Sequence, residues 1–173
     1  SLPDGEVPQR FDEYGYGMVI ADGIGTTGEI ASRLAISTLV HLAIYFGKWH
    51  VRVDDPIAEE MIDRARRFYR SVDSLLVETS QFSPGRLQTT LTAVYTAGSE
   101  LFFAHVGHSR AYVFRDGQLM QLTRDHTADR ERHRSAAMGD NTEPARDLHH
   151  LVTQSLGGPG SAAPRIDVGR CGL

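Results

Sequence analysis

The carboxylate of Asp22 is the candidate catalytic or metal-binding group that the sequence suggests first. Asp22 follows the hydrophobic residues 18–21 and opens a glycine-rich turn, residues 23–28, that leads into a predicted helix. The carboxylate thus lies where a strand opens onto a backbone nest, a kind of turn suited to metal ions or phosphate groups. An ordinary aspartate in the turn before a helix is the alternative interpretation.

A second polar segment, residues 104–117, reads Ala-His-Val-Gly-His-Ser-Arg-Ala-Tyr-Val-Phe-Arg-Asp-Gly. Neutral imidazole is a good ligand for manganese or zinc, so His108 is a candidate metal ligand. The alternative is a partly buried histidine at the end of a strand. Arg110 could bind a substrate phosphate, but an ion pair that anchors the following hairpin is the favoured reading.

Other polar side chains give weaker signals. His126, His133, His149 and His150 have a spacing that fits no compact zinc site, so they are predicted to be solvated. Asp125 and His126 are predicted to be structural caps after a hairpin. Cys171 has only Arg170 as a basic neighbour, which makes it a poor nucleophile.

Two long helices are expected to support these residues. Apolar positions recur with the helical period over residues 28–46, where Thr26 and Glu29 have capping-box spacing and Gly47 is a natural stop. A second helix starts at Asp55 and its following proline and runs to about residue 78. Two such helices joined by a short connector are expected to pack as an antiparallel pair against a sheet.

Strands fill the rest of the pattern. Residues 14–21 are predicted to be a strand buried on both faces, and residues 89–96 and 100–106 form an antiparallel pair. Asp116 and its glycine mark a hairpin between residues 110–115 and 118–122. Residues 145–156 are predicted to be helical and residues 165–169 a short strand. Separate blocks of helices and antiparallel strands indicate an α+β fold.

Composition limits the class of protein. The chain has 173 residues, 40% of them hydrophobic, which suffices for one core. A net charge of −4 argues against nucleic acid as a partner, and the arginines of residues 64–70 are read as the solvated face of a helix. A single cysteine, no recognisable signal peptide and no apolar run near the roughly 18 residues of a membrane span predict a cytoplasmic protein without a membrane partner.

The motifs occur in an order that resembles the type 2C metal-dependent serine/threonine protein phosphatases, especially the bacterial ones. The run Ala-Asp-Gly-Ile-Gly at residues 21–25 is similar to the family's first metal-binding turn. Thr89 and Thr90, the run Val-Gly-His-Ser-Arg-Ala-Tyr at 106–112, the Asp-Gly hairpin and Leu-Thr-Arg-Asp-His-Thr at 122–127 follow in family order. Residues 152–158 resemble the family's Leu-Gly segment.

This resemblance implies a two-sheet antiparallel β-sandwich flanked by helix pairs, over a single partial domain of residues 1–173. It also implies two Mn²⁺ or Mg²⁺ ions, with Asp22 as the bridging catalytic carboxylate and the Gly23 carbonyl as a ligand. A metal-activated water would then attack phosphoserine or phosphothreonine in a phosphorylated protein substrate.

Several departures from the family pattern bear on activity. Its N-terminal arginine and acidic pair and its C-terminal aspartates have no counterpart here, His108 replaces an aspartate, and no histidine occupies the turn at 24–27. Two divalent ions need about six oxygen ligands each, so the ions should bind weakly and activity should be low. We read the chain as a fragment of a longer phosphatase; the alternatives are a catalytically dead phosphatase-like binding module and an unrelated α+β domain.

A sandwich that lacks outer strands leaves an unpaired sheet edge, and such edges pair with other chains. The edge next to residues 18–21 is therefore predicted to form a homodimer.

Overall fold

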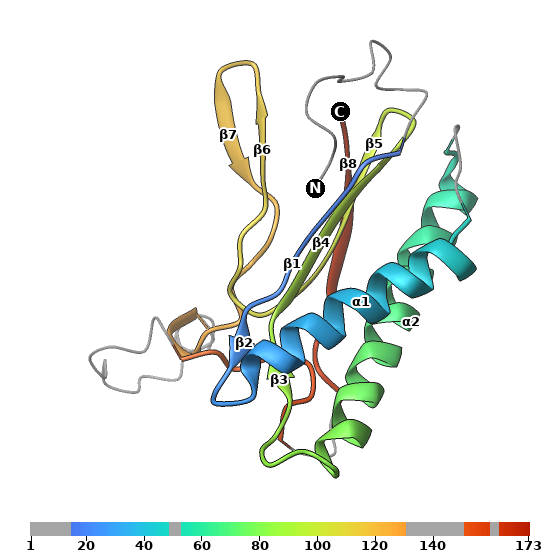
Figure 1. Cartoon of the computed structure of the whole chain (residues 1–173). Coiled ribbons are helices and arrows are strands. Elements are labelled where there is room, and N and C mark those ends of the chain that lie inside the picture. The colour runs from blue at the N-terminus through green and yellow to red at the C-terminus, as the bar shows by residue number, and fades with distance from the viewer. Residues whose placement is uncertain (1–14, 49–52, 131–150, 160–162) are drawn as a thin grey trace, which may run out of the picture.

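The computed structural model describes residues 15–48, 53–130, 151–159 and 163–173 of the chain. Four antiparallel strands form the main sheet, in the order β1-β4-β5-β8 (Figure 1). They are β1 (Gly17–Ile20), β4 (Leu91–Ala97), β5 (Glu100–Val106) and β8 (Asp167–Gly172). The sheet thus gathers segments from both ends of the chain around the central β4–β5 hairpin.

Two helices, α1 (Gly28–Phe46) and α2 (Asp55–Ser80), lie on one face of this sheet (Figure 1). Ala31 and Ala35 of α1 are fully buried, and their small side chains allow close packing. Tyr69 of α2 is also buried, and its hydroxyl donates a hydrogen bond of 2.8 Å to the carbonyl of Ala104 in β5. The shared core also contains Val72, Leu76, Leu87, Leu91, Val106 and Leu156. This arrangement confirms the predicted α+β fold.

The helix boundaries match the predictions, but the caps differ. The predicted capping box is wrong, because Thr27 is the cap residue of α1 and its side chain makes no hydrogen bond to the helix. The Thr27 hydroxyl instead donates to the carbonyl of Arg86, at 2.7 Å. Helix α2 is capped by Asp54, whose carboxylate accepts the N–H of Ile57 at 2.9 Å. Gly47 ends α1 as expected.

Helix α1 is more apolar than the sequence reading allowed. Its 19 residues have a mean hydropathy of 1.2 over the best 18-residue window, of which 17% is buried. In the described part of the chain, α1 is the one helix long and apolar enough to cross a membrane. The expectation that no segment approaches this criterion was therefore wrong, although the core helix of a folded domain can pass the same test.

Short strands complete the structure near the turn that carries Asp22. The predicted strand 89–96 is split, because Thr90 separates β3 (Gln88–Thr89) from β4, and β3 pairs with β2 (Gly23–Ile24).

The Asp-Gly hairpin is confirmed: β6 (Tyr112–Arg115) and β7 (Gln118–Gln121) flank Asp116 and Gly117, whose φ angles are 51° and 74°. Positive φ at both positions is the geometry of a type I′ turn. The hairpin extends away from the main sheet (Figure 1).

Three predictions about burial and local structure were wrong. Strand β1 is not buried on both faces, since Met18 and Ile20 are 67% and 56% exposed at the edge of the sheet. Residues 151–156 are not helical, because Val152 and Leu156 make isolated bridges to Thr127 and Thr89. The preceding residues, 145–150, lie outside the described ranges.

The third error concerns the arginines of α2. Arg64 is buried, at 8% exposure, whereas it was expected on a solvated face. Its guanidinium pairs with the carboxylate of Glu60 and also donates to the carbonyl of Lys48, at 3.3 Å. An arginine paired and hydrogen-bonded in this way can be buried without an uncompensated charge.

Candidate metal-binding site

Asp22 is held by its backbone at the point where β1 leaves the main sheet. Its carbonyl accepts the N–H of Thr90, at 2.9 Å, and the hydroxyl of Thr89, at 3.0 Å. Its N–H donates to the hydroxyl of Thr90, at 3.1 Å. Both threonines are fully buried, whereas the Asp22 side chain is 66% exposed. The backbone is therefore fixed while the carboxylate faces solvent, as a metal ligand must.

The turn after Asp22 depends on glycine. A Cβ on Gly23 would lie 1.9 Å from the carbonyl oxygen of Gly28, so the two backbones approach too closely for a side chain. Gly25 has a φ of 76° and accepts the N–H of Gly28, at 3.1 Å. This tight turn places the start of α1 next to Gly23, in keeping with the predicted strand–turn–helix arrangement.

The structure brings two of the predicted site residues together. Nε2 of His108 lies 3.9 Å from Oδ2 of Asp22, although the residues belong to segments far apart in the sequence. The His108 side chain is 34% exposed, as expected for a partly buried residue after a strand. Its Nδ1 is buried without a hydrogen-bond partner among the described residues. Metal-bound histidines usually donate this second N–H, so His108 lacks the usual support of a ligand.

Arg110 anchors the hairpin, as the favoured reading predicted. Its guanidinium donates to both carboxylate oxygens of Asp125, at distances between 2.6 and 3.1 Å. The hydrogen bonds and charge of Arg110 outweigh burial and lower the pKa of Asp125. The Asp125 carboxylate also accepts a hydrogen bond from the side-chain amide of Gln121 in β7, at 3.4 Å. Arg110 is thus engaged within the protein rather than free for a phosphate.

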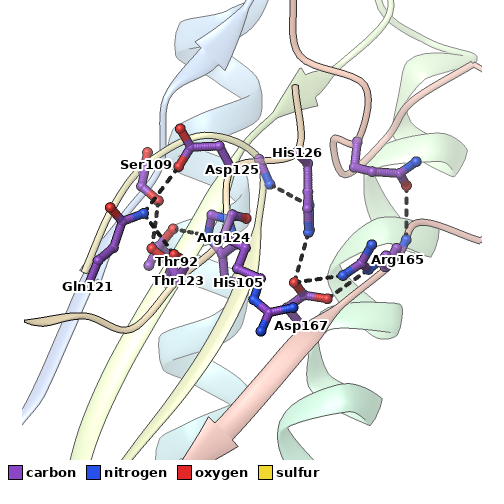
Figure 2. Close-up of polar contacts among 12 residues, drawn as sticks. Thr92, His105, Ser109, Gln121, Thr123, Arg124, Asp125, His126, Arg165 and Asp167 are labelled. Carbon is purple, nitrogen blue, oxygen red and sulfur yellow. Dashed lines mark hydrogen bonds and ion pairs between the residues drawn. The ribbon is translucent and has the colours of Figure 1, made fainter. Parts of the chain in front are cut away.

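The sequence reading missed a buried polar cluster next to this site (Figure 2). His126 was expected to be solvated, but it is 3% exposed, and it lies between His105 and Asp167. After Glu100, His105 is the one polar residue of strand β5, and this is the signal that could have revealed the cluster. His133, His149 and His150 lie outside the described residues.

The described residues do not complete a two-ion site. Over the ranges that the structure describes, no group of three or more His, Cys, Asp or Glu side chains is arranged to hold a metal ion. Asp22, the backbone of Gly23 and His108 are the candidates within this region. Cys171 is not among them; it is half-buried, and burial raises the pKa of its thiol.

Comparisons with known proteins give this geometry a context. Residues 51–139 match the family model for protein phosphatase 2C. The chain is 34% identical over 114 residues to the serine/threonine protein phosphatase PstP of Mycobacterium tuberculosis, a match that covers 64% of this chain and 20% of PstP. It is 27% identical over 144 residues to the serine/threonine phosphatase stp of Listeria welshimeri, covering 81% of this chain and 55% of that protein.

Solved structures agree. A serine/threonine phosphatase of S. agalactiae superposes with a TM-score of 0.72 at 25% identity, over 92% of this chain and 63% of that one. The catalytic domain of PstP in complex with two manganese ions gives 0.64 at 25% identity, over 96% and 68%. This chain spans between a fifth and just over half of the length of the curated relatives described above. Because the family model covers more than half of its residues, the chain belongs to the protein phosphatase 2C family.

Proposed function

We propose that residues 1–173 form part of a metal-dependent serine/threonine protein phosphatase domain, with a phosphorylated protein as substrate. The observation that supports this most directly is the position of Asp22. Thr89 and Thr90 fix its backbone, and its exposed carboxylate faces His108. A fixed, solvent-facing carboxylate at a strand end in a member of this family is a reasonable metal ligand.

The residues present offer few ligands for the metal ions of the family. Two hard divalent cations need about six oxygen ligands each, with several carboxylates to offset their charge. Asp22 and the Gly23 carbonyl provide two oxygens, and His108 adds a nitrogen. These residues do not fit a pair of Mn²⁺ or Mg²⁺ ions, so the described part of the chain should bind such ions weakly.

The residues still have distinct roles in this proposal. Asp22 and the carbonyl of Gly23 would be the oxygen ligands that this part of the chain offers a metal ion at the end of β1, and the absence of a side chain on Gly23 lets the backbone of Gly28 pack beside it. Arg110 would keep the hairpin in place through Asp125, and Thr90 would keep Asp22 in position.

The incomplete ligand set supports a second candidate function. A phosphatase-like module without its metals would bind phosphoproteins or regulators without hydrolysing them. The two candidates differ in one measurable property, which is whether slow hydrolysis depends on both manganese and Asp22.

The test is single-turnover hydrolysis of a phosphothreonine peptide, with the protein in excess and millimolar Mn²⁺. Slow, Mn²⁺-dependent release of phosphate that Asp22→Asn removes would support the phosphatase. An identical slow rate in both proteins would overturn the role of Asp22. Binding of the peptide without any release of phosphate would favour the binding module.

Two further features of the chain belong to this proposal. Among the residues that the structure describes, strand β1 is paired on one side only, which supports a homodimer formed through its other edge. We also propose a cytoplasmic location, with neither nucleic acid nor a membrane as partner. The net charge of −4 supports the exclusion of nucleic acid.

A further inference from the structure

A row of polar side chains crosses the main sheet on the face turned away from the helices. Thr92 of β4, His105 of β5 and Asp167 of β8 are directly paired in the strand register. Their neighbours along the strands, Leu91 and Ala104, belong to the core under the helices. Since successive side chains alternate between faces, the polar row lies on the opposite face.

His105 is fully buried and is satisfied as a neutral imidazole. Its Nε2 lies 3.1 Å from the carbonyl of Arg124, and its Nδ1 lies 2.8 Å from the hydroxyl of Thr92. A carbonyl can only accept, so Nε2 carries the proton and Nδ1 accepts from Thr92. Burial, together with the nearby His126, lowers the pKa of His105 to about 4. His105 is therefore a neutral residue at neutral pH, and it serves the fold through its hydrogen bonds to Thr92 and Arg124.

His126 holds both backbone groups of one glycine. Its N–H donates to the carbonyl of Gly107, at 2.7 Å, and its Nδ1 accepts the N–H of Gly107, at 3.2 Å. Because Nδ1 accepts, the ring proton lies on Nε2. Nε2 lies 3.2 Å from Oδ2 of Asp167, which is within the distance of an ion pair. The angle at Nε2 is not that of a hydrogen bond.

Asp167 is in turn held from its other side. Arg165 donates to both of its carboxylate oxygens, at 2.9 and 3.2 Å (Figure 2). Burial acts to raise the pKa of Asp167, but the contacts with Arg165 and His126 outweigh it and lower the pKa. The carboxylate is thus kept charged beside His126.

Gly107 is the joint between β5 and the candidate site. Its φ of 118° is a glycine conformation, and a Cβ there would lie 2.5 Å from Cβ of Thr90. Thr90 is the residue that fixes the backbone of Asp22, and His108 follows Gly107 directly. The two hydrogen bonds between His126 and Gly107, called here the His126 clamp, are therefore linked to the Asp22–His108 pair through Thr90 and through the peptide bond from Gly107 to His108.

We infer that His126 and Asp167 are positioning residues: through the backbone of Gly107 they hold His108 against Asp22. This inference rests on the proposed function only in so far as Asp22 and His108 serve that function. The clamp itself is defined by the contacts of Gly107, which can be measured with or without a metal.

The first test uses the unmodified chain, labelled with ¹⁵N, and nuclear magnetic resonance. A scalar coupling across the hydrogen bond between the Gly107 N–H and Nδ1 of His126 is expected, together with imidazole shifts for a proton on Nε2. A protonated Nδ1 in the folded protein would overturn the inference, because the clamp needs that nitrogen as an acceptor.

The second test compares variants that remove one contact each. Asp167→Asn keeps the size of the side chain and removes its charge, and it should shift the amide resonances of Gly107, His108 and Asp22. Asp55→Asn is the control for the loss of one negative charge, since the exposed Asp55 forms an ion pair with Arg170 of β8, at 2.5 Å, away from Gly107. It should leave those three resonances in place. Changes confined to β8 in Asp167→Asn would overturn the inference.

A third variant keeps the test decisive if Asp167→Asn fails to fold. His126→Asn retains an acceptor near the position of Nδ1, so it should preserve the Gly107 resonance better than His126→Ala does. Equal losses in the two variants would contradict the clamp. Where Mn²⁺ binding is measurable, Asp167→Asn should weaken it about tenfold, since losing a residue that positions a ligand has typically this effect. Absent Mn²⁺ binding in the unmodified chain would count against the proposed function and leave the resonance tests intact.

Discussion

Thr90 and Asp22 hold each other through two reciprocal hydrogen bonds. The Thr90 N–H donates to the Asp22 carbonyl at 2.9 Å, and the Thr90 hydroxyl accepts the Asp22 N–H at 3.1 Å. One is a backbone pairing and the other depends on a side chain. A substitution at Thr90 can therefore loosen Asp22 without altering the carboxylate itself.

Thr90→Val should lower the free energy of unfolding by about 1 kcal/mol, since it removes the hydrogen bond of the partly buried Asp22 N–H. Urea denaturation measures this loss. Thr90→Ser is the control, because it keeps the hydroxyl and should lose less. If valine proved as stable as threonine, the side-chain bond would contribute nothing.

Asp22 should account for whatever affinity the chain has for Mn²⁺. We expect weak binding by calorimetry and no measurable binding by Asp22→Asn, which retains the shape of the side chain. The exposed Asp55→Asn serves as a control for the loss of one negative charge. Tight binding of two ions by the unmodified chain would show that ligands outside the described residues complete the site.

Gly107 should tolerate no other residue. Gly107→Ala combines a φ of 118° with a contact of 2.5 Å to Thr90, and we expect a loss of several kcal/mol or failure to fold. Gly117→Ala separates the two causes, because φ is 74° there but no atom lies within 4 Å of the added methyl. It should lose only about 1 kcal/mol. Similar losses at both positions would rule out the steric contribution of Thr90.

Stability should fall as the pH is lowered from about 6.5 to about 4, because of His105. Its pKa is about 4 in the folded protein and 6.5 in a model compound, so the unfolded chain binds more protons in this window. The full effect amounts to on the order of 3 kcal/mol. The pKa values of Asp125 and Asp167 are lowered from the ordinary aspartate value of 3.8, so protonation of these two residues removes further stability as the pH falls below about 3.8.

Urea denaturation between pH 7 and pH 4 checks this window. His105→Gln should be less stable at pH 7 but should show a flatter pH profile. An unchanged slope in that variant would assign the acid sensitivity to other groups.

The edge of β1 that has no partner strand in the described part of the chain should support dimers. Light scattering should give a mass near twice 19.1 kDa at high concentration. Met18→Lys places a charge on this edge strand and should shift the protein towards the monomer. Met120→Lys, on the exposed hairpin, is the matched control. A monomer at every concentration tested would contradict the prediction.

The elements with local signals were predictable. Apolar periodicity marked α1 and α2, and the Asp-Gly pair marked the β6–β7 hairpin, because these patterns act over a few neighbouring residues. The interpretation of residues 151–156 as helical failed for the opposite reason. Val152 and Leu156 are held by bridges to distant residues, which no local pattern reveals.

The site was predictable in its parts but not in its connections. The motif order identified Asp22 and His108, whereas their approach to 3.9 Å depends on the pairing of β1 with β4 and of β4 with β5. His126 was read as solvated because its neighbours in the sequence are polar. Its burial follows from Asp167, which reaches it only because β8 pairs with β5.

The order of strands in the main sheet has a consequence for the folding pathway. The β4–β5 hairpin is local and can form early, whereas β1 and β8 come from opposite ends of the chain and dock on its two sides at a greater entropic cost. Asp22 follows β1, which docks on one side of the hairpin, and Asp167 belongs to β8, which docks on the other. The candidate site should therefore assemble last, and amide exchange should show it opening before the hairpin does.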